Sequence, residues 1–323
     1  MNLHSANILI TGGTGSFGNR VVKHLVSHGA KNIRVFSRDE KKQWEMKQLF
    51  PSVDYWIGDI RDRERTQQAM RGIDYVFHAA ALKHVPACES YPMEAVKTNV
   101  LGTYNVCEAA KHERVKMVVS LSTDKAVKPV NAMGISKAMA EKIVCNENAS
   151  FSSTVFCCVR YGNVIGSRGS VVPLFMKLIQ QNVPITITVP EMTRFLLTLD
   201  DAVDLVFYAF KYAVGGEIFV RKSPACTVQL LAETMRNKYS VQRENHPIIV
   251  TGVRPGEKIH EVLVNEYEIQ RVRSEDNFFI IGAERNATTQ TDVIEEYTSA
   301  NTKQLVTEQE VSNFLDTMGP IDV

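Results

Sequence analysis

The stretch TGGTGSFG at residues 11–18 decides the fold that we expect for this chain. It follows a short apolar segment, NILIT (7–11), and it opens a segment whose apolar residues recur at helical spacing. Glycines are needed where a backbone turns sharply, approaches a pyrophosphate closely, or packs a helix against a strand. Their position between a strand and a helix therefore predicts a dinucleotide-binding turn rather than an ordinary glycine-rich loop.

The glycines of this turn fit two patterns at once. One pattern uses Gly12, Gly15 and Gly18, and the other replaces Gly12 by Gly13 to give G-x-G-x-x-G. In either case the free N–H groups at the start of the helix are expected to hold the cofactor phosphates. The first predicted cofactor residues are Gly12, Thr14, Gly15, Ser16, Phe17 and Gly18.

Outward from this turn, the first half of the chain alternates strand and helix patterns. The predicted strands are nearly unbroken apolar runs, which is typical of a parallel sheet covered by helices on both faces. We therefore predict an α/β fold with a doubly wound parallel sheet of the Rossmann type, with ligands bound beyond the carboxyl ends of the strands. The predicted strands are NILIT (7–11), NIRVFS (32–37), VDYWIGD (53–59), DYVFHAA (74–80), KMVVSLS (116–122) and TVFCCVRYG (154–162).

The second half loses this regular rhythm, and the length of 323 residues suggests about two domains. We predict a dinucleotide-binding domain at 1–165, with parts of about 195–222 returning to it. Residues 166–323 are predicted to form mainly a smaller, substrate-binding domain. Its last helix is expected to open with the capping box Thr307-x-x-Glu310.

Composition argues against several kinds of partner. The 37 basic and 36 acidic residues give a net charge of +1, which favours neither nucleic acid nor a membrane surface. There is no secretory leader pattern and no apolar run long enough to span a bilayer, so we expect a cytoplasmic protein. The six cysteines lack C-x-x-C spacing and are expected to be reduced. His24 and His28 have no third ligand nearby, so no metal is expected.

The end of the second predicted strand bears on the choice of cofactor. A carboxylate at this position binds the ribose diol of NAD, whereas an arginine pairs with the 2′-phosphate of NADP. The order Ser37, Arg38, Asp39, followed by Lys41 and Lys42, favours NADP, although Asp39 keeps NAD as the less favoured alternative. The alternative is that these charges only solvate the start of a helix. Further predicted cofactor positions at strand ends are Asp59, Ile60, Ala79, Ala80 and Ala81, each of which could also be ordinary strand termination.

The segment KMVVSLSTDKAVKP (116–129) carries the candidate chemistry. A buried strand ends here in Thr123, Asp124 and Lys125, at the sheet edge where a nicotinamide would lie. An acid beside an amine is elsewhere more often a solvated ion pair. At this position it offers a proton donor and a proton acceptor next to a hydride carrier.

NAMGISK (131–137) raises a question about the usual base. Short-chain dehydrogenases carry a Tyr-x-x-x-Lys pair in such a segment, and here Met133 occupies the tyrosine position while Lys137 keeps the lysine. A thioether has no proton to exchange. Either the chain is an inactive relative of a redox enzyme, or its chemistry depends on other residues.

Taken together, the motifs closely resemble those of one family. Its members are the inverting UDP-N-acetylglucosamine 4,6-dehydratases, which are extended short-chain dehydrogenases/reductases of bacterial glycan synthesis. Met133 in NAMGISKAMAEK resembles the CapE-like subgroup of capsular polysaccharide synthesis. The motifs are SRDE (37–40), HAAALKHVP (78–86), TNVLGT (98–103), STDKAV (122–127), RYGNV (160–164), SRGSVVPLF (167–175), EMTRF (191–195) and RPGEK (254–258), with the glycines above.

The resemblance implies a lyase reaction. UDP-N-acetylglucosamine would be converted to UDP-2-acetamido-2,6-dideoxy-β-L-arabino-hexos-4-ulose, with tightly held NADP regenerated in each turnover, for capsule or other surface polysaccharide. Lys125 would take the C5 proton if its surroundings keep it neutral part of the time, and Asp124 would protonate the departing hydroxide. Thr123 would bind the C4 oxygen, and Lys137 the nicotinamide ribose. The C4 hydroxyl would lose its proton to Lys125 or Asp124, or less favourably to a water relayed through Thr123 toward Lys137.

The resemblance also implies a substrate side and an assembly. Met133 would pack against substrate or cofactor, and SRGSVVP would close over the nucleotide. Tyr161 and Asn99 are placed on the cofactor side, with a purely helix-internal role as the alternative for Asn99. The family suggests a homo-oligomer such as a hexamer. The predicted substrate residues are Lys83, Met133, Asn163, Val171, Arg194, Arg254 and Glu257.

Two other functions compete with this one. A UDP-sugar 4-epimerase or a non-inverting dehydratase is the first, although non-inverting enzymes typically carry Asp-Glu where this chain has Asp124-Lys125. A catalytically silent NADP-binding protein is the second, and Met133 supports it. A silent protein, however, has no use for an acid and an amine beside the nicotinamide.

Overall fold

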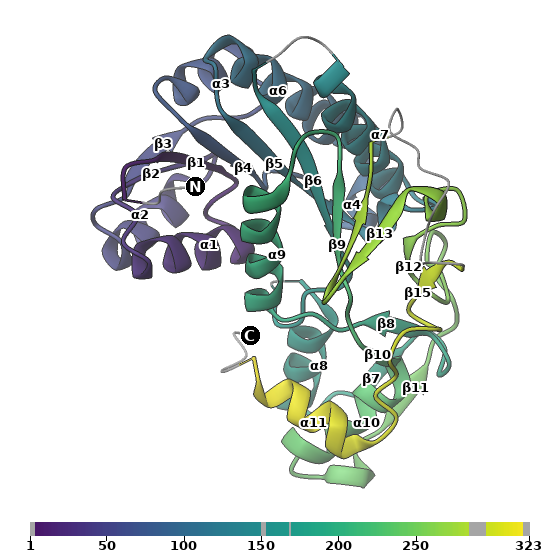
Figure 1. Ribbon diagram of the computed structural model, residues 1–323. Coiled ribbons are helices and arrows are strands. Elements are labelled where there is room, and N and C mark those ends of the chain that lie inside the picture. Colours follow the sequence, from purple (N-terminus) through teal and green to yellow (C-terminus); the bar gives the residue numbers. More distant parts are fainter. Residues whose placement is uncertain (1–3, 150–152, 168, 284–294, 319–323) are drawn as a thin grey trace.

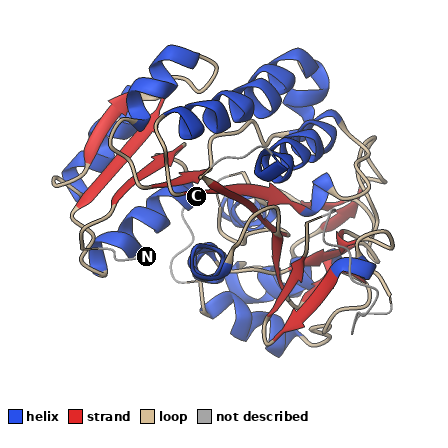
Figure 2. Ribbon diagram, turned by 45° about the horizontal axis from the view of Figure 1, so that its top comes forward, coloured by secondary structure: helices blue, strands red, loops and turns tan. Residues whose placement is uncertain are grey.

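A computed structural model describes residues 4–149, 153–167, 169–283 and 295–318 of the chain. It confirms the predicted α/β class, with one large and mostly parallel sheet (Figures 1 and 2). In the described residues this sheet has nine strands in the order β13-β14-β9-β6-β5-β4-β1-β2-β3. The strands are β1 (Asn7–Thr11), β2 (Asn32–Ser37), β3 (Asp54–Ile57), β4 (Tyr75–His78), β5 (Met117–Thr123), β6 (Val155–Tyr161), β9 (Ile218–Arg221), β13 (Val272–Glu275) and β14 (Phe278–Ile281).

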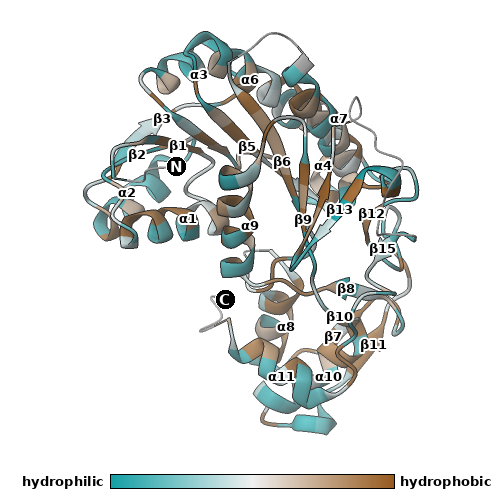
Figure 3. Ribbon diagram, in the orientation of Figure 1, coloured by the Kyte–Doolittle hydropathy of each residue, from teal (hydrophilic) through white to brown (hydrophobic). Residues whose placement is uncertain are grey.

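The order of the strands reverses between β1 and β4. β1 pairs in parallel with β2 on one side and with β4 on the other, so the chain crosses over at this point. In an open α/β sheet, such a switch leaves a crevice at the carboxyl ends of the strands. The central strands β5 and β6 are buried along most of their length, as their apolar sequences predict, and Figure 3 shows them as hydrophobic.

Helices cover both faces of the sheet. One face is packed by α1 (Ser16–Ser27), α2 (Glu40–Leu49) and α9 (Leu199–Tyr212), and the other by α3 (Arg63–Met70), α6 (Thr103–His112) and α7 (Ala132–Asn146). The short helices α4 (Val85–Ser90) and α5 (Pro92–Ala95) precede α6. Between α5 and α6 the chain forms a π-helical turn over Val96–Gly102, which the sequence pattern did not indicate.

The remaining elements form a smaller lobe, seen in the lower part of Figure 1, and most of them pack around a second apolar core. Its last helix begins with the predicted capping box, in which Thr307 Oγ1 accepts the Glu310 N–H at 3.2 Å. The elements of this lobe are α8 (Val171–Gln180), α10 (Val228–Tyr239), α11 (Glu308–Asp316), β7 (Ile185–Ile187), β8 (Thr193–Phe195), β10 (Ala225–Thr227), β11 (Ile248–Val250), β12 (Val262–Val264) and β15 (Tyr297–Thr298).

The two regions are joined through the large sheet. Strand β9 pairs in parallel with β6, and α9 packs on the same sheet. The strands β14 and β13 then extend the sheet antiparallel beyond β9, outside the segment that we predicted to return to it. The proposed division at residue 165 stays a prediction, but the sheet continues across it.

A buried arginine lies under this junction. Arg160 of β6 is 1% exposed, and its guanidinium contacts Glu141 of α7 and Glu268. The Nη2–Oε1 distance to Glu268 is 2.8 Å, and Nη1 also donates to the Leu263 carbonyl at 2.8 Å. One side chain of the sheet therefore links a covering helix to the segment that follows β12.

None of the helices within the described ranges combines the length and the apolar character that a membrane span requires.

Candidate active site

The glycine turn has the close contacts that its sequence predicts. Gly12 has φ +67°, and a Cβ atom there would lie 2.8 Å from the backbone of Ala80 on the neighbouring strand end. A Cβ at Gly18 would lie 2.4 Å from Gly13 Cα. Gly15 is the N-cap of α1 and offers no side-chain cap. The first turn of this helix thus faces the crevice with its positive end, as phosphate binding requires.

A cleft of about 680 Å³ opens above this turn at the carboxyl ends of the strands. Every predicted cofactor residue except Asn99 lines it. Thr123, Lys125 and Lys137 line it too, together with the predicted substrate residues Lys83, Met133 and Asn163. The predicted site residues that do not line it are Asn99, Asp124, Val171, Arg194, Arg254 and Glu257.

Asp39 and Arg38, the two charged residues predicted near the cofactor ribose, have different surroundings in the structure. Asp39 is occupied locally, because its Oδ1 accepts the Lys42 N–H at 3.0 Å as the N-cap of α2. Its Oδ2 also lies 2.6 Å from Lys42 Nζ. Arg38 has a side chain that is 53% exposed, with Nη1 3.6 Å from Asp59 Oδ2. The carboxylate is thus already paired, and the guanidinium keeps most of its donors at the cleft.

The catalytic turn begins where β5 ends. Asp124, Lys125 and Ala126 form a 3-10 turn, and the Thr123 hydroxyl donates to Asp124 Oδ1 at 2.8 Å. Lys125 Nζ donates to the same oxygen at 3.1 Å. Asp124 is fully buried, and its Oδ2 has no hydrogen-bond partner among the described residues. Burial raises the pKa of this carboxyl, although Lys125 acts against it, so its protonated form is favoured more than usual.

The amine of Lys125 departs from one expectation. We expected its surroundings to keep it neutral part of the time, and burial alone would lower its pKa. The carboxylates of Asp124 and Glu261 outweigh burial, and the pKa of Lys125 is raised. The isolated site therefore holds Lys125 as an ammonium, which also donates to Asn163 Oδ1 at 3.2 Å.

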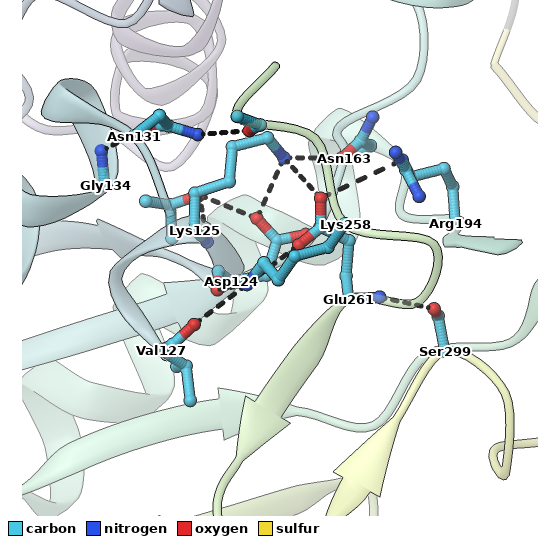
Figure 4. Close-up of polar contacts among 12 residues, drawn as sticks. Asp124, Lys125, Val127, Asn131, Gly134, Asn163, Arg194, Lys258, Glu261 and Ser299 are labelled. Atoms are coloured by element: carbon cyan, nitrogen blue, oxygen red, sulfur yellow. Dashed lines mark hydrogen bonds and ion pairs between the residues drawn. The ribbon is translucent and has the colours of Figure 1, made fainter. Parts of the chain in front are cut away.

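Glu261 and Lys258 belong to this site and were not predicted as site residues. Glu261 Oε1 lies 3.4 Å from Lys125 Nζ, and Lys258 Nζ lies 3.1 Å from Glu261 Oε2 (Figure 4). Lys258 is the last residue of RPGEK, which was the only local signal for either residue. Arg194, which we predicted to bind substrate, points at Glu261 across 3.8 Å and donates to the Ile259 carbonyl at 3.2 Å.

Met133 and Lys137 lie on α7, against the cleft. Met133 is buried in a small apolar cluster with Cys88 and Ala95, consistent with a packing role. Lys137 Nζ donates to the Leu121 carbonyl at 2.5 Å, and burial lowers the pKa of its amine.

Asn99 does not line the cleft, and its side chain binds the loop at Leu82. Its Oδ1 accepts the Leu82 N–H at 2.7 Å, and its Nδ2 donates to the Leu82 carbonyl and to Ser136 Oγ. Both amide hydrogens and the carbonyl are used, so the geometry matches the helix-internal alternative rather than cofactor contact.

The remaining predicted substrate residues lie on the small lobe. Val171 is the first residue of α8, directly after the cleft residues Gly169 and Ser170. Arg254 is exposed, whereas Glu257 Oε2 is buried without a hydrogen-bond partner in the described part of the chain. Across the described ranges no group of three or more His, Cys, Asp or Glu side chains is arranged to hold a metal ion.

Comparison with known proteins shows which fold the chain shares and which family it belongs to. Its fold resembles that of solved nucleotide-sugar enzymes. One is DesIV, a dTDP-glucose 4,6-dehydratase from Streptomyces venezuelae, which shares the fold at TM-score 0.70 and 20% identity over 78% of this chain and 87% of DesIV. The chain belongs to the polysaccharide biosynthesis protein family, whose model matches residues 8–283.

Two relatives are much more similar in sequence. A protein of Rickettsia bellii named UDP-glucose 4-epimerase is 48% identical over 94% of this chain and 93% of its own length. The structure of Pen from Bacillus thuringiensis is 39% identical with TM-score 0.91, covering 98% of this chain and all (100%) of Pen.

Proposed function

We propose that the chain is a nucleotide-sugar 4,6-dehydratase that inverts C5 of UDP-N-acetylglucosamine. The observation that carries this proposal is the pairing of a carboxyl, Asp124, with an amine, Lys125, at the end of β5, where Lys125 lines the cleft and Asp124 is buried beside it. Elimination across C5 and C6 needs both a base for the C5 proton and an acid for the C6 hydroxyl. Epimerisation at C4 alone needs neither.

The raised pKa of Lys125 is compatible with this chemistry if Asp124 and Lys125 share one proton. Transfer of that proton from Lys125 Nζ to Asp124 Oδ1, across 3.1 Å, gives a neutral amine and a neutral acid without changing the total proton count. The amine then takes the C5 proton, and the acid gives its proton to the departing hydroxide, which leaves as water. The ion pair is restored, the proton from the C4 hydroxyl passes on to water, and a proton taken from water on the opposite face of C5 inverts that carbon.

The residues of the cleft fit a nicotinamide dinucleotide. The turn at Gly12 lets a ligand approach the backbone, and α1 starts without a side-chain cap. When bound, the dinucleotide supplies a hydride acceptor for the sugar C4 and a hydride donor for C6. For the C4 hydroxyl proton we favour Asp124 or Lys125, because the Lys137 amine is already bound to the Leu121 carbonyl.

On the substrate side we propose that Lys83 and Asn163 contact the sugar nucleotide inside the cleft. Arg254 would bind a phosphate. Glu257 Oε2, which has no hydrogen-bond partner among the described residues, would accept a hydrogen bond from a hydroxyl group of the substrate. Arg194 does not line the cleft, and its guanidinium would influence the site through Glu261, from which it lies 3.8 Å away. A homo-oligomer and a cytoplasmic location stay predictions.

A UDP-sugar 4-epimerase is the second candidate, because relatives that are 45–48% identical carry that name. Incubation with UDP-N-acetylglucosamine in D₂O distinguishes the possibilities by NMR and mass spectrometry. We expect a 4-keto-6-deoxy sugar with deuterium at C5 and inverted C5 configuration. An isomeric sugar without deuterium would establish the epimerase instead, and an unchanged sugar would indicate a silent binder. The same incubation with UDP-glucose tests the substrate named for the relatives.

The cofactor preference can be tested at Arg38. We propose NADP, because Arg38 is exposed at the cleft while Asp39 is engaged by Lys42. Replacing Arg38 by Ala is expected to weaken NADP binding by about 10-fold to 100-fold, since a charge-assisted contact to phosphate contributes about 1.5–3 kcal/mol. NAD binding should stay nearly unchanged. Calorimetry with both dinucleotides measures this, and Lys47→Ala at the far end of α2 is the matched control. Equal loss for both cofactors would contradict the assignment.

A further inference from the structure

Glu261 is a buried carboxylate at the back of the catalytic turn, and none of the proton transfers proposed above involves it. It directly precedes β12, and its side chain is 3% exposed. Its carboxylate faces three cations, with Lys125 at 3.4 Å, Lys258 at 3.1 Å and Arg194 at 3.8 Å. A buried charge with three partners is fixed in place far more firmly than a surface ion pair.

The segment that carries Glu261 is bound to both ends of the catalytic turn. Lys258 Nζ donates to the Asp124 carbonyl at 3.2 Å and to the Val127 carbonyl at 2.8 Å. Asn131, the N-cap of α7, donates from Nδ2 to the Gly256 carbonyl at 2.8 Å (Figure 4). The small lobe therefore holds Glu261 at a set distance from the amine of Lys125.

We infer that Glu261 is a positioning residue of the proposed dehydration, whose carboxylate fixes the place of the Lys125 amine and biases the shared proton toward it. The inference rests on the proposed function, in which that proton must move between Lys125 and Asp124. Glu261 itself stays ionised, because its three cationic neighbours outweigh burial and lower its pKa to about 2. It touches no reacting atom and acts through Lys125.

The charged groups facing Lys125 are few. Asp124 of the turn and Glu261 of the small lobe attract its ammonium, and Arg194 of β8 repels it. Asn163, after β6, contributes an uncharged acceptor. Because Asp124 and Lys125 interact strongly, their titration belongs to the pair. The active form holds one proton on the pair, so activity should rise when the pair loses its first proton and fall when it loses its second. A negative charge beside the pair raises both of these pH values.

Replacing Glu261 by Gln tests this. Both limbs of the pH profile of kcat/KM are expected to shift to lower pH, by about one to three pH units for the loss of an opposite charge at this distance. Glu261→Asp keeps the charge but withdraws it by one methylene group, so its limbs should lie between those of the parent and those of Glu261→Gln. Glu266→Gln removes an exposed carboxylate close to β12, which pairs with Lys128, and should leave both limbs in place.

A second measurement does not depend on turnover. The rate at which a small anhydride acetylates Lys125, followed against pH by peptide mass spectrometry, reports the titration of that amine directly. Lys125 is reachable, since its side chain is 25% exposed in the cleft. Its titration should move to lower pH in the order parent, Glu261→Asp, Glu261→Gln.

The outcomes separate the two proposals. If the titration moves in this order but neither the parent nor any variant makes a keto sugar, the effect of Glu261 on the Lys125 amine stands and the dehydratase assignment fails. If folded Glu261 variants lose activity while the limbs and the titration stay at the parent values, Glu261 is only structural and this inference is overturned. Should Glu261→Gln not fold, the comparison of the parent with Glu261→Asp decides by the same criterion.

Discussion

The Lys125→Ala variant is expected to lose formation of the 4-keto-6-deoxy sugar by about 10²-fold to 10⁴-fold or more, because a positioned base contributes an effect of that size. Removing the amine leaves the C5 proton without an acceptor on the floor of the cleft. It also leaves Glu261 without one of its three cations. Product formation is followed by NMR, and deuterium uptake at C5 by mass spectrometry.

The same variant separates the two proton transfers. If Lys125 serves only C5, the variant should still oxidise C4, and the near-ultraviolet absorbance of reduced nicotinamide should build up when substrate is added. If Lys125 also takes the C4 hydroxyl proton, no reduced cofactor should appear. Lys128→Ala is the matched control, since this exposed lysine on the same segment pairs with Glu266 outside the cleft and should keep the parent rate. Product formation by Lys125→Ala at the parent rate would remove the basis for the acid and base assignment.

The largest effect on stability is expected at Arg160. Replacing it by Met should lower the free energy of unfolding by about 3–5 kcal/mol, because removal of one partner leaves buried charges unpaired. The carboxylates of Glu141 and Glu268 would then face each other without the guanidinium. Unfolding in denaturant, followed by circular dichroism, measures the change.

Two comparisons make this prediction specific. Arg20→Met breaks a pair with Asp200 that is partly exposed, and it should cost about 1 kcal/mol or less. Replacing Arg160, Glu141 and Glu268 together by apolar residues of similar size should recover most of the lost stability, since no charge is left buried. A single Arg160→Met variant as stable as the parent would show that the triad contributes little.

The fold was predictable because its signals are local. NILIT and NIRVFS become β1 and β2 with the expected bounds, and the turn at Gly12 has the left-handed backbone that its glycine implies. Asp124 and Lys125 were found for the same reason, because they are neighbours in the chain at the end of a strand. Periodicity and strand ends are sufficient for features of this kind.

Features that depend on distant segments were not predictable. Burial lowers the pKa of Lys125, whereas Asp124 and the distant Glu261 together raise it, and the sequence around Lys125 shows only Asp124 of these influences. The position of Asn99 depends on a π-helical turn, which changes the direction of its side chain relative to an ordinary helix. The three-dimensional structure was needed to assign the charge state of Lys125 and the contacts of Asn99.

Strands β9, β14 and β13 cover the edge of the sheet at β6, so the first half of the chain is not expected to be stable without them. A fragment ending at residue 165 would leave β6 as an open edge, with apolar side chains and free backbone groups ready to pair with another molecule. Arg160 would also lose Glu268. The nucleotide-binding half should therefore aggregate when expressed by itself, and the intact chain should melt in one cooperative transition rather than lobe by lobe.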